Sequence, residues 1–185
     1  MNIQTLSISD LKLLHLYHSA DERGDFVKTF HAIDFEKYQL DMEIKESFYS
    51  ISNKDVIRGM HFQLPPSQHS KLVFCSQGAI VDVVLDLRKD SPSYLQFISV
   101  ELQASKPQAL FIPAGCAHGF KSLADHTITN YFVSSAYDAS ADAGIHYQSF
   151  GFDWGIANPI ISKRDQSFPS ITEFQSPFKR ITNTL

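Results

Sequence analysis

The chain has 185 residues, of which 43% are hydrophobic and 12% aromatic; this argues against a disordered chain and favours one domain with a sizeable core. Its formal net charge of -4 gives no reason to expect nucleic acid or an anionic membrane as a partner. Because the N-terminus lacks a signal peptide pattern and no apolar run approaches membrane-spanning length, we expect a single soluble, cytoplasmic domain over residues 1–185.

Short strands separated by turn residues dominate the sequence. A helical turn is expected at residues 35–38, with Asp34 as its cap. The expected strands follow in chain order at 58–63, 71–75, 79–87, 95–102, 109–112 and 127–133, and a tail of loops and helical turns begins near Pro159. This spacing predicts an all-β fold, a cupin-like double-stranded β-helix jelly-roll barrel with short flanking helical turns.

The two cysteines give a prediction about burial. Cys75 and Cys116 lie in apolar, strand-like segments, and neither belongs to a Cys-x-x-Cys pair. We interpret them as buried free thiols in a reducing compartment.

Two segments place a histidine beside glycines: Arg58-Gly59-Met60-His61-Phe62-Gln63 and Pro113-Ala114-Gly115-Cys116-Ala117-His118-Gly119-Phe120. If both fold as strands of one barrel, their imidazoles can face a single pocket. Histidine is the side chain best suited to moving protons near neutral pH, and it also binds metals. Metal binding, proton transfer and simple packing therefore have to be distinguished.

A metal site needs more ligands than these segments supply. Gln63, an amide, stands two residues after His61, and no glutamate occurs in the stretch 67–71. The cationic Lys71 would also oppose a divalent ion. Two histidines without a carboxylate or thiolate do not make a convincing catalytic metal site, so we expect none.

Packing against backbone carbonyls in the core is the alternative for both histidines. For His118 the packing and functional interpretations have equal weight. Beside His61, the cations Arg58 and Lys71 favour an anion-binding pocket, because cations seldom point into a barrel interior without an anion. Arg23 and Arg58 together fit a diphosphate, although Arg23 alone is equally a solvated loop residue.

In their order and spacing, these segments resemble the dTDP-4-dehydrorhamnose 3,5-epimerase family from about Asp21 to Asp165. The resemblance is carried by Asp21-Glu22-Arg23-Gly24, the segment 58–63, Lys71-Leu72-Val73, the segment 82–88, Ser91-Pro92, the segment 112–120, Gly144-Ile145, Asp153-Trp154 and Ser162-Lys163-Arg164-Asp165. The family's substrate is a nucleotide-linked 4-keto-6-deoxyhexose, whose ketone acidifies the C–H bonds on both neighbouring carbons. The resemblance implies that a base removes a proton, an enolate forms at the C4 oxygen, and an acid reprotonates the opposite face without a cofactor.

The resemblance also implies roles in catalysis for four residues. His61 is the base, and Asp165 orients its imidazole and stabilises the imidazolium. Tyr131 is the acid, and Lys71 stabilises the enolate oxygen. The alternatives are that Tyr131 is a core residue with a bonded hydroxyl and that Asp165 forms a surface ion pair of little energetic consequence.

Substrate binding is implied for a second set. Arg23 and Arg58 hold the diphosphate, His118 contacts the sugar or a phosphate, and Tyr137 borders the sugar and the nucleotide. Members of the family are dimers in which the early segment crosses to the neighbouring subunit. Arg23 and Phe26 are therefore expected to serve the active site of the partner in a homodimer.

Three positions depart from the family pattern: Lys28, Glu46 and Phe48 replace the usual Glu, Gln and Asn. A carboxylate at position 28 accepts the N3–H of thymine, whereas lysine can only donate. Because N3 and O2 of cytosine are acceptors, Lys28 suits a CDP-linked sugar better than a dTDP-linked one.

Several alternatives stay open at this point. The enzyme acts on C3, on C5 or on both, and its nucleotide is dTDP or CDP. A non-catalytic, cupin-like sugar-nucleotide-binding protein would keep Arg23 and Arg58 but would not need His61, Asp165 and Tyr131. The third alternative to an epimerase and a binding protein is a metal-dependent cupin oxygenase or isomerase.

Overall fold

The structure of the protein, a computed structural model, describes residues 1–40 and 42–181. The strands are β1 (Asn2–Thr5), β2 (Lys12–His15), β3 (Tyr17–Asp21), β4 (Gly24–Lys28), β5 (Glu46–Ser52), β6 (Ile57–Gln63), β7 (Lys71–Gln77), β8 (Ala79–Asp86), β9 (Phe97–Gln103), β10 (Gln108–Ile112), β11 (Cys116–Ser122), β12 (Thr127–Val133) and β13 (Asp142–Gly144). The helices are α1 (Ala32–Lys37) and α2 (Lys163–Gln166). Neither helix is long and apolar enough to cross a lipid bilayer.

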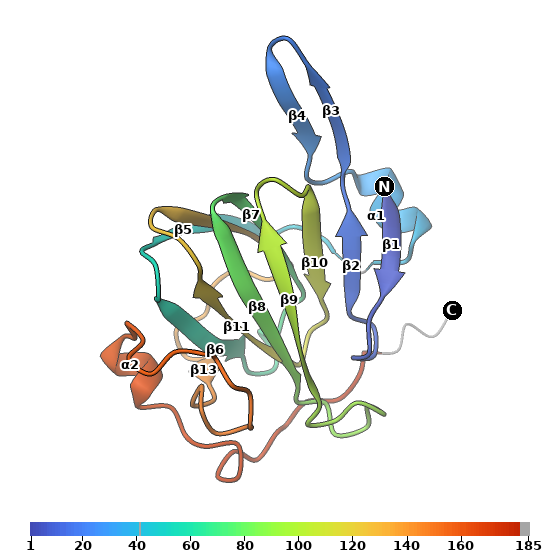
Figure 1. The fold of residues 1–185 in the computed structure, drawn as a ribbon. Coiled ribbons are helices and arrows are strands. Elements are labelled where there is room, and N and C mark those ends of the chain that lie inside the picture. The colour runs from blue at the N-terminus through green and yellow to red at the C-terminus, as the bar shows by residue number, and fades with distance from the viewer. Residues whose placement is uncertain (41, 182–185) are drawn as a thin grey trace.

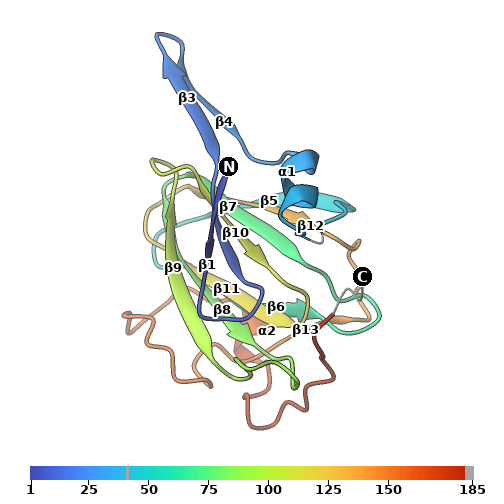
Figure 2. The same cartoon turned by 90° about the vertical axis from the view of Figure 1, so that its right-hand side faces the viewer.

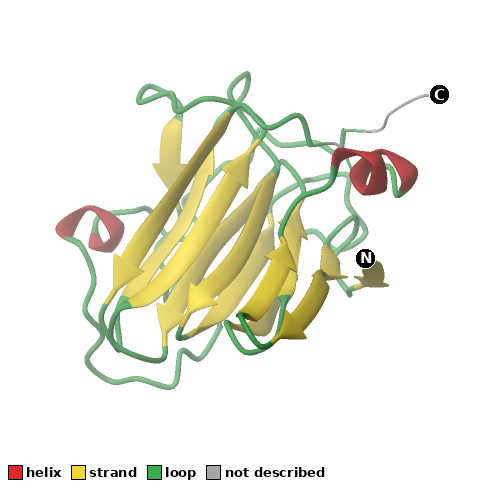
Figure 3. Cartoon of the chain, turned by 90° about the horizontal axis from the view of Figure 1, so that it is seen from above, coloured by secondary structure: helices red, strands yellow, loops and turns green. Residues whose placement is uncertain are grey.

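Two antiparallel sheets face each other and form the body of the molecule (Figures 1 and 3). One has the strand order β1-β2-β10-β7-β12-β5, and the other has the order β13-β6-β11-β8-β9. Neighbouring strands are mostly far apart in the chain, as the Greek-key connections of a jelly roll require. The predicted all-β jelly-roll barrel is confirmed.

A third, two-stranded sheet stands apart from this body. It is the hairpin β3–β4, which projects well beyond the barrel (Figures 1 and 2). All residues of β3 are exposed, and so are all of β4 except the half-buried Val27. A hairpin with so little buried surface is marginally stable on its own.

The period of two residues along each strand separates the interior from the outer faces. On β8, Ile80 and Val84 belong to the interior cluster, whereas Val83 and Leu85 belong to a second cluster on the outer face. Strands from both sheets contribute to the interior cluster, which fills the space between them. This alternation also directs polar residues such as Asp82 inward, and so creates the site described below.

Both outer faces are covered as well. Phe35 of α1 and neighbouring residues pack on the six-stranded sheet, whereas Trp154 and Phe178 from the C-terminal segment pack on the five-stranded sheet. The tail therefore lies against the barrel, as predicted. Cys75 and Cys116 are free and buried, which confirms the prediction for both thiols.

Two details of the predicted elements are wrong. α1 begins at Ala32 with His31 as its N-cap residue, so Asp34 lies in the first turn, where its carboxylate is 3.2 Å from Nδ1 of His31. β9 begins at Phe97 rather than at residue 95, because Leu95 has a φ of 63°. That left-handed conformation is incompatible with a strand.

Candidate functional site

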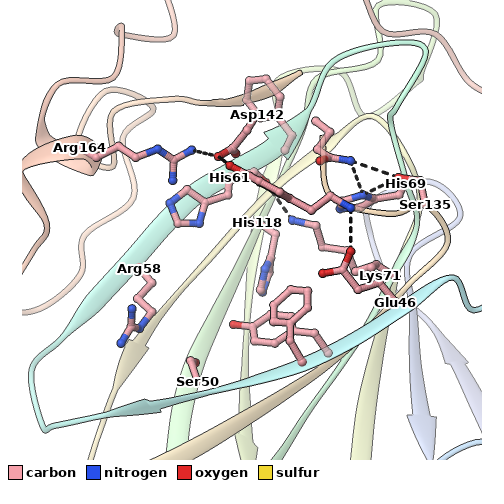
Figure 4. A pocket seen from close by; sticks show the side chains of 16 residues that line it. Glu46, Ser50, Arg58, His61, His69, Lys71, His118, Ser135, Asp142 and Arg164 are labelled. Atoms are coloured by element: carbon pink, nitrogen blue, oxygen red, sulfur yellow. Dashed lines mark hydrogen bonds and ion pairs between the residues drawn. The ribbon is translucent and has the colours of Figure 1, made fainter. Parts of the chain in front are cut away.

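A pocket of about 390 Å³ opens into one end of the barrel, between the two sheets (Figure 4). Its size is in the usual range for small-molecule sites, roughly 300–1,000 Å³. The lining side chains come from six strands, from α2, from the β6–β7 connection and from the segment that follows β12. They are Glu46, Phe48, Ser50, Arg58, His61, Phe62, Gln63, His69, Lys71, His118, Tyr131, Val133, Ser135, Tyr137, Asp142 and Arg164.

The two histidines of the sequence motifs lie opposite each other. His61 on β6 and His118 on β11 are cross-strand partners in an antiparallel pair, so both side chains point to the same face of the sheet. Both line the pocket (Figure 4). The expectation that the two imidazoles face one cavity therefore holds.

Glycines make this close pairing of strands possible. Gly59 has a φ of 132°, and a Cβ atom there would lie 2.5 Å from the Cα of Gly119. A Cβ atom at Gly119 would in turn meet the carbonyl oxygen of Arg58 and the sulfur of Met60, each at 2.8 Å. The glycine beside each histidine is thus required by the contact between β6 and β11, where the register also shifts.

His61 is bonded to a carboxylate that arrives from far along the chain. Its Nε2 lies 2.9 Å from Oδ1 of Asp165, and the other oxygen of Asp165 accepts the backbone N–H of Gly59 at 3.0 Å. Asp165 is only 4% exposed, although it lies in the short surface helix α2, whose N-cap Ser162 accepts the Asp165 N–H. With Nε2–H donated to Asp165, Nδ1 of His61 is the nitrogen left to accept a proton.

The environment of Asp165 keeps it ionised. Burial raises the pKa of this carboxyl, but the hydrogen bond and charge of His61 and the N–H of Gly59 lower it more, so the net pKa is below its usual value. A buried carboxylate bonded to an imidazole orients the ring and favours its protonated form. The interpretation of Asp165 as a surface ion pair is excluded by its burial.

His118 has its own carboxylate. Its Nε2 lies 2.7 Å from Oδ2 of Asp82, and both side chains are buried. Burial lowers the pKa of His118 despite the attraction of Asp82, and the positive charges of Lys71 and His61 lower it further. His118 is therefore held as a fixed, neutral imidazole at the floor of the pocket, bonded to a carboxylate rather than to a backbone carbonyl.

Lys71 brings a cation to the same floor. Its ammonium group donates to the carbonyl oxygen of His61 at 3.1 Å, which leaves further N–H groups for a ligand. Burial lowers the pKa of Lys71 to about 8, a shift that the negative charges of Asp82 and Asp142 partly oppose. The amine therefore titrates close to neutral pH.

Tyr131 on β12 forms the wall beside His118. Its ring is stacked on Phe48, with centroids 4.7 Å apart and planes 18° apart, and it meets the ring of His118 at an edge. Tyr131 is 8% exposed, and burial raises the pKa of its phenol. The phenol consequently stays protonated at neutral pH and can act as an acid.

Two arginines stand at the mouth of the pocket (Figure 4). Arg58 donates to two neutral oxygens, Oγ of Ser52 and the carbonyl of Ile51. Arg164 is paired with Asp142 at 2.6 Å, and the same carboxylate oxygen accepts the hydroxyl of Tyr137. The mouth thus has positive charge suited to a phosphorylated ligand.

A network of neutral groups holds the segment that carries Tyr137. The Gln63 amide donates to Ser67, Ser135 and Ala136, and its oxygen accepts the N–H of Asp138 at 2.6 Å. Glu46 accepts the N–H of Tyr137 at 2.7 Å, so this carboxylate has a structural partner. His69, beside Gln63, has its pKa lowered to about 3 by burial and by Lys71, and it stays neutral.

Three predicted binding residues lie away from this pocket. Arg23 and Phe26 are on the projecting hairpin, where Arg23 pairs with Asp21 and Phe26 contacts Tyr17. Lys28 lies on the same hairpin, at its barrel end, and its ammonium group lies over the ring of Tyr17. Within one chain, the structure therefore separates these three residues from the histidines.

The sequence motifs did not single out several residues of the site. Asp82, Asp142 and Arg164 belong to it, as do Ser50, His69 and Ser135. Of these, Asp82 and Arg164 occur inside segments that carried the family resemblance, which was the available signal. Within residues 1–40 and 42–181, no three His, Cys, Asp or Glu side chains gather as metal ligands would.

Comparisons with known proteins all match the same enzyme family. The sequence profile of the dTDP-4-dehydrorhamnose 3,5-epimerase family matches residues 5–173. The dTDP-4-dehydrorhamnose 3,5-epimerase of Sinorhizobium fredii is 35% identical over 185 residues, which cover 98% of this chain and 95% of that protein. The dTDP-4-dehydrorhamnose 3-epimerase of Streptomyces niveus is 32% identical over 90% of this chain and 82% of its own.

A solved structure is similar over the whole barrel. It is that of dTDP-6-deoxy-D-glucose-3,5-epimerase from Legionella pneumophila Philadelphia 1 in complex with dTDP-4-keto-L-rhamnose. It matches with a TM-score of 0.91 and 28% identity over 98% of each chain.

Proposed function

Because this chain belongs to the dTDP-4-dehydrorhamnose 3,5-epimerase family, we propose that its pocket inverts carbons beside the ketone of a dTDP-linked 4-keto-6-deoxyhexose through a C4 enolate. The protein is an isomerase of deoxysugar biosynthesis with a cupin-type jelly roll. The relatives include both 3,5-epimerases and a 3-epimerase, and both names include epimerisation at C3. The observation that carries the proposal is the His61–Asp165 pair at the open side of the pocket.

His61 is the base. Its imidazole is held by Asp165 at 2.9 Å, and its side chain is 31% exposed, so a substrate can reach the ring. A proton leaves the carbon next to the ketone and goes to Nδ1 of His61, while the electron pair of the C–H bond moves to the C4 oxygen. The carboxylate of Asp165 stabilises the imidazolium that forms.

Lys71 and Tyr131 complete the reaction. The ammonium of Lys71, fixed at the pocket floor beside His61, stabilises the enolate oxygen. The Tyr131 phenol, protonated because burial raises its pKa, donates its proton to the opposite face of the carbon. The phenolate and the imidazolium then exchange protons with water, which restores the enzyme without a cofactor.

The remaining groups bind the substrate. Arg58 and Arg164 at the mouth are suited to the diphosphate, and Arg164 can exchange Asp142 for a phosphate oxygen. His118 is neutral and its Nε2–H is bonded to Asp82, so its Nδ1 can accept one hydrogen bond from the sugar. Tyr137 borders the nucleotide side of the pocket, and the backbone N–H of Tyr137 is bonded to Glu46.

A homodimer with exchanged hairpins accounts for Arg23, Phe26 and Lys28. The hairpin β3–β4 projects beyond its own barrel (Figure 1), and Phe26 is 57% exposed although it contacts Tyr17. If the hairpin of one subunit reaches the pocket of the other, Arg23 adds a third cation for the diphosphate and Lys28 approaches the nucleobase.

Solvent exchange tests the function directly. The purified protein is mixed with the dTDP-linked 4-keto sugar in D₂O, and NMR follows deuterium at C3 and C5. Wild-type protein should exchange hydrogen for deuterium on at least one of these carbons, and His61→Ala should reduce the rate of this exchange by about 10²–10⁴-fold. A wild-type protein that binds the nucleotide sugar without exchange would instead be a binding protein. Equal rates in both proteins would show that His61 is not the base.

A further inference from the structure

Phe48 has an unusual position for a large apolar side chain. It lies on the edge strand β5 and is 48% exposed, yet it faces inward and lines a pocket in which most of the other lining residues are polar or charged. Among the described residues, it belongs to none of the three apolar core clusters. Core packing therefore does not explain why a phenyl ring stands at this point.

The contact that Phe48 does make is with Tyr131. The two residues are directly opposite each other on β5 and β12, and their rings are stacked at 4.7 Å with an angle of 18°. Aromatic cross-strand pairs of this kind restrict the rotamers of both rings. The ring of Tyr131 also packs against that of His118 in a T-shaped arrangement, with centroids 6.0 Å apart, and Asp82 holds the imidazole. Tyr131 thus contacts two rings, one of them fixed by a carboxylate.

We propose that Phe48 is a positioning residue, which holds the Tyr131 phenol on the protonating face of the sugar and so determines how often proton exchange ends in inversion. This inference rests on the proposed function, in which Tyr131 is the acid. An enolate has two fates. Reprotonation by the His61 imidazolium returns the original configuration, whereas reprotonation by Tyr131 inverts the carbon.

The two fates can be counted separately in D₂O. Each abstraction that equilibrates with solvent leaves deuterium on the carbon, and only protonation by Tyr131 changes the configuration. The ratio of inverted to total exchanged molecules at each carbon therefore measures the competition between the two acids. A mutation that merely loosens the fold lowers both rates together and leaves this ratio unchanged.

Phe48→Leu removes the flat ring and keeps an apolar side chain. Aromatic stacking is worth enough to change a population by about two- to tenfold, so we expect the inversion-to-exchange ratio to fall by about this factor. Phe48→Tyr keeps the ring and should restore the wild-type ratio. Tyr49→Leu is the matched control, because Tyr49 lies on the same strand, points to the outer side and is 64% exposed. Its ratio should equal that of the wild type.

The experiment distinguishes this inference from the function on which it rests. Tyr131→Phe should exchange without inversion, and if it inverts at the wild-type rate, the assignment of the acid is wrong. If Tyr131→Phe loses inversion while Phe48→Leu keeps the wild-type ratio, only the role of Phe48 is overturned. Thermal unfolding shows whether each variant is folded, and Phe48→Met gives a second non-aromatic variant if Phe48→Leu is not. A wild-type ratio in folded Phe48→Met would overturn the role of Phe48 equally.

Discussion

His61 and His118 are cross-strand partners, yet each imidazole is bonded to a different carboxylate, Asp165 at 2.9 Å and Asp82 at 2.7 Å. The side chain of His61 is 31% exposed, whereas that of His118 is 4% exposed. Burial lowers the pKa of His118, so this ring resists the proton that a base must accept. The same type of dyad thus leaves one imidazole open to the pocket and fixes the other as a neutral hydrogen-bonding group.

Asp165→Asn tests the first of these dyads. The amide oxygen still accepts the N–H of Gly59, so the fold should persist, but the imidazolium loses its neighbouring negative charge. We expect the rate of solvent exchange to fall by about 10²–10⁴-fold, with a small change in the melting temperature. Asp125→Asn is the control, because this exposed carboxylate accepts only the N–H of Lys54. An active Asp165→Asn variant would contradict the role of the dyad.

Lys71 should produce an alkaline limit to activity. Burial lowers its pKa to about 8, so the ammonium, which we propose stabilises the enolate, is present below this pH and is lost as the pH rises through it. We therefore expect kcat/KM for exchange to decline with an apparent pKa near 8. Arginine keeps its charge at higher pH, so in Lys71→Arg the alkaline decline of kcat/KM should shift to higher pH, whatever the maximum rate. If the pH of this decline does not change, another group causes it.

Gly59→Ala tests the contact between the two histidine strands. The added Cβ would lie 2.5 Å from the Cα of Gly119, at a φ of 132° that L side chains rarely adopt. We expect the free energy of unfolding, measured with urea, to fall by about 3 kcal/mol or more. Gly151→Ala is the matched control, since Gly151 also has a positive φ but nothing within 4 Å of its Cβ position. This variant should lose only about 1 kcal/mol.

Lys28→Glu tests both hairpin exchange and base recognition. In an exchanged dimer, a carboxylate at this position accepts the N3–H of thymine, which lysine cannot do. We expect kcat/KM for the dTDP-linked sugar to rise relative to the CDP-linked sugar by about tenfold, the value of one good hydrogen bond to a charged group. Lys37→Glu, on α1, gives the same change of charge at a site away from the hairpin. An unchanged ratio in Lys28→Glu would separate Lys28 from the nucleotide.

The barrel and its histidines were predictable because their signals are local. Alternating apolar residues on β8 and the glycines beside His61 and His118 identify inward-facing strands without any knowledge of the partner strand. The strands β1, β3 and β4 lacked such a signal, because most of their residues are exposed and polar. The cap of α1 was misplaced since an acidic residue fits the first turn as well as the cap.

The partners of the histidines were harder to predict. Asp165 is 104 residues from His61 and Asp82 is 36 from His118, and no periodicity relates such distant positions. The family resemblance supplied Asp165, whereas Asp82 lay unnoticed inside a strand. Arg164 and Asp142 come from segments outside the main strands, where only the folded chain shows which side chains meet.

The separation of His61 and Asp165 along the sequence has a consequence for how a newly made chain becomes active. His61, the proposed base, sits on β6 between β13 and β11, but its carboxylate partner belongs to the tail on the outer face of the barrel, so their contact is among the most non-local in the described structure. Such contacts form late, because the entropy of closing a long loop must be overcome first. A nascent or partly refolded chain can thus bury its core and still be inactive, and the onset of catalysis marks the docking of the tail.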